Sequence, residues 1–495
     1  MKRNKKIIIL LAALICVSLA AFGVSRYEEK KEIIKNSDEI IMEVASEDVN
    51  VLSWECDTGS YAFHRDEDGG WLYDTDEAFP VDGEKIEGLL EQFQEFGVSF
   101  IIEEVEDFGQ YGLETPVCTI HMETGSDTYE ILLGNYSAMD SERYVSIGDG
   151  NAYLVKNDPL GQFEIEISDV ILHDEIPYME DVTQVQLSGA ESEKIVYEED
   201  SRNTYYAGDV YFMEQDAAKM PLDTTRVNDY LSTVQNLNLK DYVTYNATEE
   251  ELQAYGMDAP ELSIVLDYTV SDEETEGKTA GTFTLHVGRD PEEREKEAAE
   301  NAVDSESEDL NGEESENMET EPESAEDGAE GENEVTAYAR VGDSKIVYQI
   351  TAEQYEKLMD MSYDSLRHQE MFWADFGDMY QLDILLEGKK YTITSEMEDD
   401  ERTYYYQEEE QEMAGIRGAI RGLTATDFTD ETPTEKEEIS FTVYLDNENY
   451  PEVHIQLYRY DGNSCIAVVD GESVAFVERA KVIDLVETVN SIVLK

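Results

Sequence analysis

Carboxylates are the commonest side chains in this sequence that could do chemistry, and two close groups of them have the spacing of cation ligands. The segments Asp66–Gly69 and Asp74–Asp76 each bring oxygen ligands together, and hard cations such as calcium require oxygen ligands. Neither segment continues into the fixed carboxylates of a helix-loop-helix calcium loop. Because Gly69 and Gly70 precede Trp71, we interpret the first segment as a hairpin tip and predict no metal-binding residues.

Histidine and serine patterns give no catalytic arrangement. The sequence has no His-Glu-x-x-His pair, no Gly-x-Ser-x-Gly elbow, no phosphate loop and no dinucleotide fingerprint. We therefore predict no catalytic residues, no cofactor and no cofactor-binding residues, and expect a protein that is not an enzyme. A cell-wall enzyme is the least favoured alternative, because paired carboxylates are too numerous here to identify one. The six histidines are scattered along the chain: His64, His121, His173, His286, His368 and His454.

The four cysteines do not form a metal or redox motif. Cys16 lies in the apolar N-terminal segment, and the three others cannot all pair within the chain. A disulfide between Cys56 and Cys118 is geometrically possible within one domain, but we expect free, buried thiols. No Cys-x-x-Cys spacing supports a zinc or redox site.

The C-terminal part offers the best candidate surface for docking a partner. Gly415, Gly418 and Gly422 occur among apolar residues of a predicted helix, where small residues permit close approach of another element. Arg417 and Arg421 form a basic spot one helical turn apart. The simpler interpretation, which we favour, is a weak helix packed on its own sheet.

A repeated turn organises the elements that must position these residues. Tyr111–Pro116 (YGLETP) returns as Tyr255–Pro260 (YGMDAP). The glycine after an aromatic residue indicates a sharp backbone turn, and the proline four residues later prevents helix continuation. Each copy should therefore end a helical segment and begin a strand, and the chain is built of repeats.

The neighbours of the two turns also correspond. Upstream, apolar residues with helical spacing follow Asp82 or Asp223, which we expect to cap the helix N-termini. Downstream, short strands are joined by hairpin-type turns at Gly148 and Gly342. Strand-like runs through residues 439–477 indicate a third, degraded copy without the turn. Each copy should bury one sheet face against a helix.

These residues together resemble the bacterial domain-of-unknown-function family 4340. The resemblance rests on the helix, the Tyr-Gly-Leu/Met-x-x-Pro turn and the Gly-Asp hairpin, and it covers the first two repeats. Gly70-Trp71 fits the family's Gly-Trp strand, whereas the second repeat has Asn203–Tyr206 there. The resemblance implies a membrane-anchored extracytoplasmic protein, often encoded beside gliding-motility-type ABC transporters, and it supplies no catalytic residues.

The N-terminus has the pattern of a signal anchor. Residues 1–6 are basic and residues 7–24 carry no charge, which is long enough to span a bilayer as a helix. The basic residues predict a cytoplasmic tail, a single-pass anchor in the cell membrane and an extracytoplasmic bulk. A cleaved signal peptide is the alternative. Residues 25–48 should form a juxtamembrane helix or linker.

The chain is strongly acidic, with a net charge of −81. Such a field repels nucleic acid and anionic polymers, and its simplest role is to keep the surface soluble. Residues 291–333 have almost no apolar side chains and should be disordered. The second repeat is about 40 residues longer than the first between its corresponding Gly288 and Tyr338, so this acidic segment is an insertion between two strands.

We therefore predict an α+β protein: an N-terminal transmembrane helix followed by three tandem related units, each an antiparallel β-sheet with a helix packed on one face. The units should cover residues 49–178, 179–372 and 373–495. We expect a non-enzymatic accessory or interaction module of an envelope or ABC-transporter-associated complex, with the membrane and envelope or transporter proteins as partners and no nucleic acid. The alternative is an extracytoplasmic receptor for a small ligand or cation.

Overall fold

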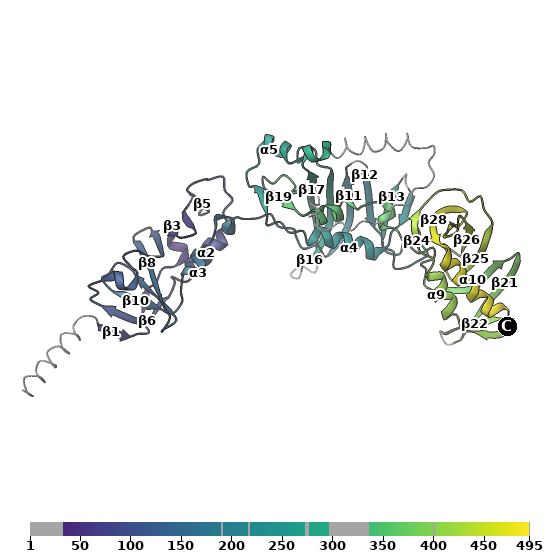
Figure 1. The fold of residues 1–495 in the computed structure, drawn as a ribbon, viewed down its shortest axis with the longest axis horizontal. Helices are drawn as coiled ribbons and strands as arrows, with labels where there is room; N and C mark the ends of the chain where they lie inside the picture. The colour runs from purple at the N-terminus through teal and green to yellow at the C-terminus, as the bar shows by residue number, and fades with distance from the viewer. Residues whose placement is uncertain are drawn as a thin grey trace, which may run out of the picture. The chain divides into compact units, whose positions relative to one another are not determined.

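The computed structural model describes residues 33–189, 192–215, 218–272, 277–296, 336–398 and 401–494. Within them the chain forms three large antiparallel sheets of ten, nine and nine strands, coloured from purple to yellow along the chain in Figure 1. We call the three sheets with their helices repeats one, two and three. The chain divides into two compact units: Met1–Asp174 holds repeat one, and Glu175–Lys495 holds repeats two and three.

Repeat one begins at the first described residue. Its helical segments are η1 (Ser46–Asp48), α2 (Gly83–Glu91), η2 (Phe108–Tyr111), α3 (Leu160–Phe163) and η3 (Ile167–Val170). Its strands are β1 (Ile33–Asn36), β2 (Ile40–Met42), β3 (Val49–Cys56), β4 (Gly59–Arg65), β5 (Trp71–Tyr73), β6 (Phe96–Glu103), β7 (Cys118–Thr124), β8 (Thr128–Ser137), β9 (Glu142–Ser146) and β10 (Ala152–Val155).

Repeat two follows the same plan with longer central strands. Its helices are α4 (Thr224–Gln235), α5 (Glu249–Ala254), α7 (Ala352–Met359) and α8 (Tyr363–Leu366). Its strands are β11 (Asp181–Ser188), β12 (Ser192–Tyr197), β13 (Tyr211–Gln215), β14 (Ala218–Pro221), β15 (Tyr242–Thr244), β16 (Leu262–Asp272), β17 (Gly277–Arg289), β18 (Ala337–Val341) and β19 (Val347–Ile350).

Repeat three ends the chain. Its helices are α9 (Ala414–Arg421) and α10 (Arg479–Val493). Its strands are β20 (Met379–Leu386), β21 (Lys389–Glu398), β22 (Glu401–Tyr406), β23 (Glu409–Gln411), β24 (Ala425–Phe428), β25 (Glu437–Leu445), β26 (Glu452–Arg459), β27 (Ser464–Val469) and β28 (Glu472–Glu478).

The three sheets share the order of eight strands, and repeat one differs at the edges, where it adds β1 and β2 and lacks a counterpart of β14 and β23. The chain first forms a run of hairpins, and then a helix (α2, α4 or α9) leads to a strand at or near the far edge (β6, β15 or β24). A four-strand meander returns from the centre, and its first strand pairs with the first hairpin strand, as β3·β7, β11·β16 and β20·β25. Repeat three shares this order although its sequence lacks the Tyr-Gly-x-x-x-Pro turn.

The predicted helix caps are confirmed. The Asp82 carboxylate accepts hydrogen bonds from the backbone N–H groups of Glu84 and Lys85, and the Asp223 carboxylate accepts one from Thr225. Each cap satisfies N–H groups that the first helical turn leaves without a partner. The apolar residues with helical spacing after Asp82 continue to Phe96, but α2 ends at Glu91. Phe96 is the first residue of β6.

The repeated turn also behaves as predicted. Gly112 follows η2 with a φ of 73°, and Gly256 follows α5 with a φ of 68°. A side chain at either position would be strained, so glycine is required there. The strands β7 and β16 begin shortly after the turn prolines. Because the turn depends only on neighbouring residues, its sequence signal is reliable.

One face of each sheet carries the hydrophobic core. In repeat three, α9 and α10 lie side by side over that face (Figure 1), and their buried residues join the sheet's core cluster. The opposite face is polar: Asp383 lies between the buried Leu382 and Ile384 and accepts a hydrogen bond from Thr392 at 2.7 Å. Alternation along the strand assigns these side chains to opposite faces.

The expected fold class, α+β, is wrong. Strands make up 44% and helices 20% of the described residues, and most helices are short, so this part of the chain is mainly β. The hairpins and the strands that follow the crossing helices widen each sheet far beyond the few strands predicted. Within the described ranges, no helix is long and apolar enough to cross a membrane. The expected tail at 1–6 and anchor at 7–24 lie outside those ranges.

Two other predicted segments differ from expectation. Residues 33–48, expected in a juxtamembrane helix or linker, form β1, β2 and η1, and both strands pair with β6. The acidic insertion, expected to be disordered over 291–333, begins with a helical turn at residues 291–296, where Asp290 accepts a hydrogen bond from the N–H of Glu292. Its remainder, from residue 297 on, lies outside the described residues.

Candidate functional site

A cavity of about 500 Å³ lies at the end of repeat two, beside the turn that precedes β16. Its size falls within the range of small-molecule and side-chain pockets. Its walls come from the turn, from the β11–β12 hairpin, from the first residues of the acidic insertion and from the segment after α7. The lining residues are Leu187, Gly189, Glu193, Ala259, Pro260, Glu261, Leu262, Arg294, Met359, Met361 and Ser362.

Glu261 is the centre of the polar contacts at this cavity. One carboxylate oxygen accepts hydrogen bonds from the Arg289 N–H at 3.1 Å and the Tyr355 hydroxyl at 2.9 Å. The other lies 2.9 Å from Arg294 Nε. The Glu261 side chain is only 12% exposed, whereas that of Arg294 is 40% exposed. A largely buried carboxylate therefore holds an arginine at the cavity mouth.

Tyr355 keeps its proton in this arrangement. Burial, together with the hydrogen bond to Glu261, raises the pKa of Tyr355 to about 12. Its hydroxyl therefore remains a donor to Glu261 at all physiological pH values. The guanidinium of Arg289 also lies over the Tyr355 ring, 5.4 Å from its centroid, which fixes both side chains behind the cavity.

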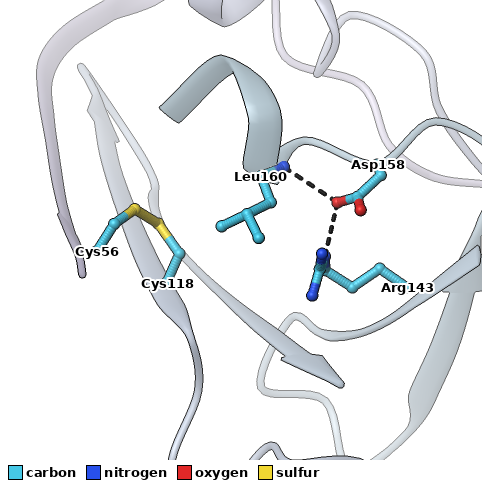
Figure 2. Close-up of a disulfide and its surroundings, with 5 residues drawn as sticks. All are labelled: Cys56, Cys118, Arg143, Asp158 and Leu160. Atoms are coloured by element: carbon cyan, nitrogen blue, oxygen red, sulfur yellow. Dashed lines mark hydrogen bonds and ion pairs between the residues drawn. A yellow bond between two sulfur atoms is a disulfide. The ribbon is translucent and has the colours of Figure 1, made fainter. Parts of the chain in front are cut away.

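The corresponding corner of repeat one contains a disulfide. Cys56 and Cys118 face each other across β3 and β7, with Cα atoms 4.3 Å apart, and are bonded to each other (Figure 2). The expectation of free thiols at these two positions is wrong, because antiparallel pairing brings together residues that are 62 positions apart. Cys465 is a free, buried thiol as predicted.

A buried arginine supports this corner of repeat one. Arg143 donates a hydrogen bond from Nε to Asp158 at 2.7 Å and another from Nη1 to the Gly134 carbonyl at 2.7 Å. The same Asp158 oxygen accepts the N–H of Leu160 at the start of α3, as Figure 2 shows. The end of repeat one is thus held by a covalent bond and an ion pair.

Repeat two replaces the disulfide with a close backbone approach. Gly189 follows Ser188, which pairs with Ser263 across β11 and β16. A Cβ atom on Gly189 would lie 2.4 Å from the Glu261 carbonyl oxygen, so no side chain fits there. Gly189 brings no side chain to this corner, and Leu262, at the position of Cys118, lines the cavity.

A second polar cluster joins repeats two and three. Asp209 is 1% exposed and accepts hydrogen bonds from Thr204 at 2.6 Å and from the Trp373 indole at 3.1 Å, and it lies 2.8 Å from His368 Nε2. The His368 ring stacks on Trp373, with centroids 4.6 Å apart. We call Thr204, Asp209, His368 and Trp373 the junction cluster.

Tyr205 extends the junction cluster into the core of repeat three. The loop between β12 and β13 carries Tyr205, which packs with Phe372, Trp373 and Tyr450. These contacts bury Tyr205 to 7% exposure. The loop that departs from the family's Gly-Trp pattern is therefore the loop that binds the next repeat.

The candidate metal segments belong to repeat one. Asp66 accepts hydrogen bonds from the N–H groups of Asp68 and Gly70, which confirms the predicted hairpin tip between β4 and β5. Asp74 lies 2.6 Å from His64 Nδ1. No group of three or more His, Cys, Asp or Glu side chains positioned to hold a metal ion is found in the described part of the chain.

The candidate docking helix of repeat three is α9. Arg417 lies over the Tyr404 ring at 5.2 Å, and Arg421 lies over the Phe376 ring at 5.1 Å. A Cβ atom on Gly415 would contact Thr488 of α10 at 3.4 Å. The basic spot and part of the small-residue stripe thus make contacts within repeat three.

Sequence reasoning missed the residues of both clusters. Glu261 follows the repeated turn at the position where repeat one has Val117, so the comparison of the two copies contained a signal for it. Asp209 and His368 are 159 positions apart, and no local pattern links them.

Comparison with known proteins supports the family resemblance for part of the chain. No curated protein and no solved structure matches the chain. The model of a family described as Domain of unknown function (DUF4340) matches residues 71–260, from the start of β5 to the proline of the second turn. The match therefore runs through most of repeat one and into repeat two, up to the turn before β16. Over these residues the resemblance to the DUF4340 family is confirmed.

Proposed function

We propose that this protein is a non-enzymatic extracytoplasmic binding protein, an accessory or interaction module of an envelope or transporter-associated complex. The observation that carries the proposal is the junction cluster, because it joins two nine-stranded sheets within one compact unit. A preorganised pair of sheets loses little conformational freedom when a partner binds, and this favours a role in recognition.

The disulfide supports the extracytoplasmic location. Disulfides form and persist in oxidising compartments and are rare in the cytoplasm. The bond between Cys56 and Cys118 joins two adjacent strands of one sheet, where it stabilises the fold of repeat one. A protein that depends on such a bond is suited to a compartment outside the cytoplasm.

The charge of the chain limits the kinds of partner that it can bind. With a net charge of −81, the protein repels nucleic acid and other polyanions. A basic protein surface would instead be attracted, and its association would weaken as salt screens the charges. We therefore expect the partner to present lysine or arginine side chains.

In-cell crosslinking of the full-length protein, followed by mass spectrometry, tests the proposal. We expect reproducible crosslinks from repeats two and three to the same envelope or transporter protein. The Asp209→Ala variant should lose crosslinks from both repeats, whereas Asp66→Ala, in the corresponding loop of repeat one, should retain them. Recovery of abundant bystanders alone, unchanged by either substitution, would contradict the interaction role.

A second candidate function is reception of a small ligand, and the cavity beside Glu261 favours it. The cavity has a volume of about 500 Å³ and combines apolar walls with charged side chains. A ligand that binds only the folded state raises the melting temperature in proportion to the logarithm of its concentration. A flat response of the soluble chain to sugars, peptides, amines and divalent cations would exclude this role.

A further inference from the structure

The cavity of repeat two has an apolar wall suited to an aliphatic chain. Leu187 and Leu262 form its floor at the ends of β11 and β16, and Pro260, Met359 and Met361 complete the wall. Methionine side chains are flexible and polarisable, so they adapt to an unbranched hydrocarbon stem. A purely polar ligand such as a sugar would leave this wall unused.

The cavity is lined by two carboxylates, Glu193 and Glu261, and one guanidinium, Arg294. Behind it, Arg289 adds a second guanidinium, whose Nε lies 3.5 Å from Glu261, so the local charges balance. The chain as a whole carries a net charge of −81, and its field favours a cation over an anion as the charged ligand of this cavity.

Arg294 already shows how such a ligand is held. Its guanidinium lies 2.9 Å from the Glu261 carboxylate, and its side chain remains 40% exposed. Arginine is a cation on an aliphatic stem, and here it comes from the short helical turn at residues 291–296 rather than from the sheet. The chain's own side chain thus occupies the position of an incoming cation.

We infer that this cavity binds a primary ammonium group carried on an unbranched aliphatic stem, with Glu261 and Glu193 holding the charge and the methionine wall holding the stem. The inference rests on the proposed binding role and gives that role a ligand chemistry. Two sources carry this chemistry: the lysine side chain of a protein partner and a free alkylamine. In both cases the ligand competes for Glu261 with Arg294, at 2.9 Å, and with Arg289, at 3.5 Å.

Titration calorimetry with three probes of equal stem length tests the charge preference. Hexylammonium, hexan-1-ol and heptanoate share one hexyl stem and differ only in the head group. We expect binding to the wild-type chain in the order hexylammonium, hexanol, heptanoate, with the first difference shrinking at high salt. Equal binding of hexylammonium and hexanol, a preference for heptanoate, or binding of none of the three would each overturn the inference.

Substitution of Arg294 shows whether the cavity prefers a positively or a negatively charged ligand. Arg294→Ala removes the internal competitor, so hexylammonium should bind about fivefold more tightly, the upper end for a partly exposed ion pair. A site built for anions would respond in the opposite direction and lose affinity. Arg226→Ala, which removes a similarly exposed arginine that lies 3.8 Å from Asp223, is the matched control and should change nothing.

Two further variants test how much the Glu193 carboxylate and the apolar wall contribute to binding. Glu193→Gln should weaken hexylammonium binding by about fivefold without affecting hexanol. Met361→Trp should fill the cavity and abolish binding of both, and an unchanged melting temperature would show that the variant still folds. Unaltered hexylammonium affinity in both variants would show that the ligand binds elsewhere and would overturn the assignment.

A Gly-Lys-Gly peptide with blocked termini distinguishes the two sources of the ammonium group, a partner's lysine and a free alkylamine. Tighter binding of the peptide than of hexylammonium identifies a partner's lysine, and the reverse identifies a free amine. The crosslinking experiment above reports separately on the interaction role. Loss of partner crosslinks with intact amine binding would contradict only that role, and retained crosslinks without amine binding would contradict only this inference.

Discussion

At the corner where the returning strand begins, repeat one has a disulfide between β3 and β7, whereas repeat two has Gly189 against Glu261 and a cavity beside them. The strand order around the two corners is the same. The difference shows that the sheet alone is sufficient to hold the corner, since repeat two lacks the covalent link. Repeat one therefore gains stability at a position where repeat two retains an opening.

The loop between β4 and β5 of repeat one differs in the same way from the loop between β12 and β13 of repeat two. In repeat one it is the exposed hairpin tip at Asp66, whereas in repeat two it carries Thr204, Tyr205 and Asp209 into the junction with repeat three. Repeat one thus stabilises itself internally, and repeat two uses the corresponding loop to bind its neighbour.

The largest expected effect comes from breaking the junction cluster. Asp209→Ala leaves the buried groups of Thr204, His368 and Trp373 without their shared acceptor, and this should lower the free energy of unfolding of the second unit by about 3–5 kcal/mol. Urea unfolding followed by Trp373 fluorescence, with Trp54 and Trp71 replaced by Phe, measures it.

The exposed loop of repeat one provides the control. Asp66→Ala removes two hydrogen bonds at a solvent-exposed hairpin tip and should cost about 1 kcal/mol or less in the first unit. Equal losses for Asp209→Ala and Asp66→Ala would show that the buried cluster contributes no more than a surface turn, and would contradict the contrast between the two loops.

Removal of the disulfide should have the next largest effect, and only in the first unit. The Cys56→Ala/Cys118→Ala variant should lose about 2–5 kcal/mol of stability there, since the bond closes a loop of 62 positions. Trp54 lies in β3 beside the disulfide and reports this transition. A change in the Trp373 transition of the second unit would show that the corner does not act locally.

The sequence predicted what neighbouring residues determine. The caps at Asp82 and Asp223, the turn glycines Gly112 and Gly256 and the hairpin at Gly69 depend on a few adjacent residues, and each forms as expected. Which distant strands pair depends on the assembled sheet. These pairings were not predicted from the sequence, and the expectation of free thiols at Cys56 and Cys118 was wrong.

The residues of the candidate site are brought together by the assembled sheet and not by closeness in the sequence. Cys56 and Cys118 become neighbours only when β3 pairs with β7, and the cavity is lined by residues from distant parts of repeat two, such as Gly189, Glu261 and Met361. The strands β6, β15 and β24 return at or near the far edge of their sheets, beyond what periodicity alone can assign. The fold class was therefore misjudged, although the repeat itself was visible in the sequence.

Two equivalent substitutions test whether the N-caps of α2 and α4 stabilise their repeats by the same free energy. Asp82→Ala and Asp223→Ala each remove an N-cap, and each should lower the stability of its own unit by about 1 kcal/mol. Restoring the acceptor with Ser should recover most of the loss. A cost confined to one repeat would show that the helix of the other repeat depends mainly on packing.

The smallest expected effect concerns pH, at a position where the repeats again differ. In repeat one, Arg65 lies over the Trp71 ring at 4.4 Å, and both side chains donate hydrogen bonds to Glu87. Burial by itself would raise the pKa of Glu87, but the hydrogen bonds from Trp71, Arg65 and Ser46 outweigh it and hold this pKa below its ordinary value. In repeat two, a pair of tyrosines, Tyr197 and Tyr211, takes the corresponding strand positions.

Because the folded-state pKa of Glu87 lies below its value in the unfolded chain, its contribution is complete above the unfolded value and disappears as pH falls through the folded one. Glu87→Gln should therefore lower the stability of the first unit at neutral pH by less than about 1 kcal/mol, and make its unfolding midpoint less sensitive to acid. Chemical unfolding between pH 7 and pH 3, followed through Trp71, measures both. The second unit serves as the internal reference, since its corresponding helix position is Asn228, which cannot titrate. If wild type and variant lost stability in parallel across this range, the carboxylate would not be the group that links repeat one to pH.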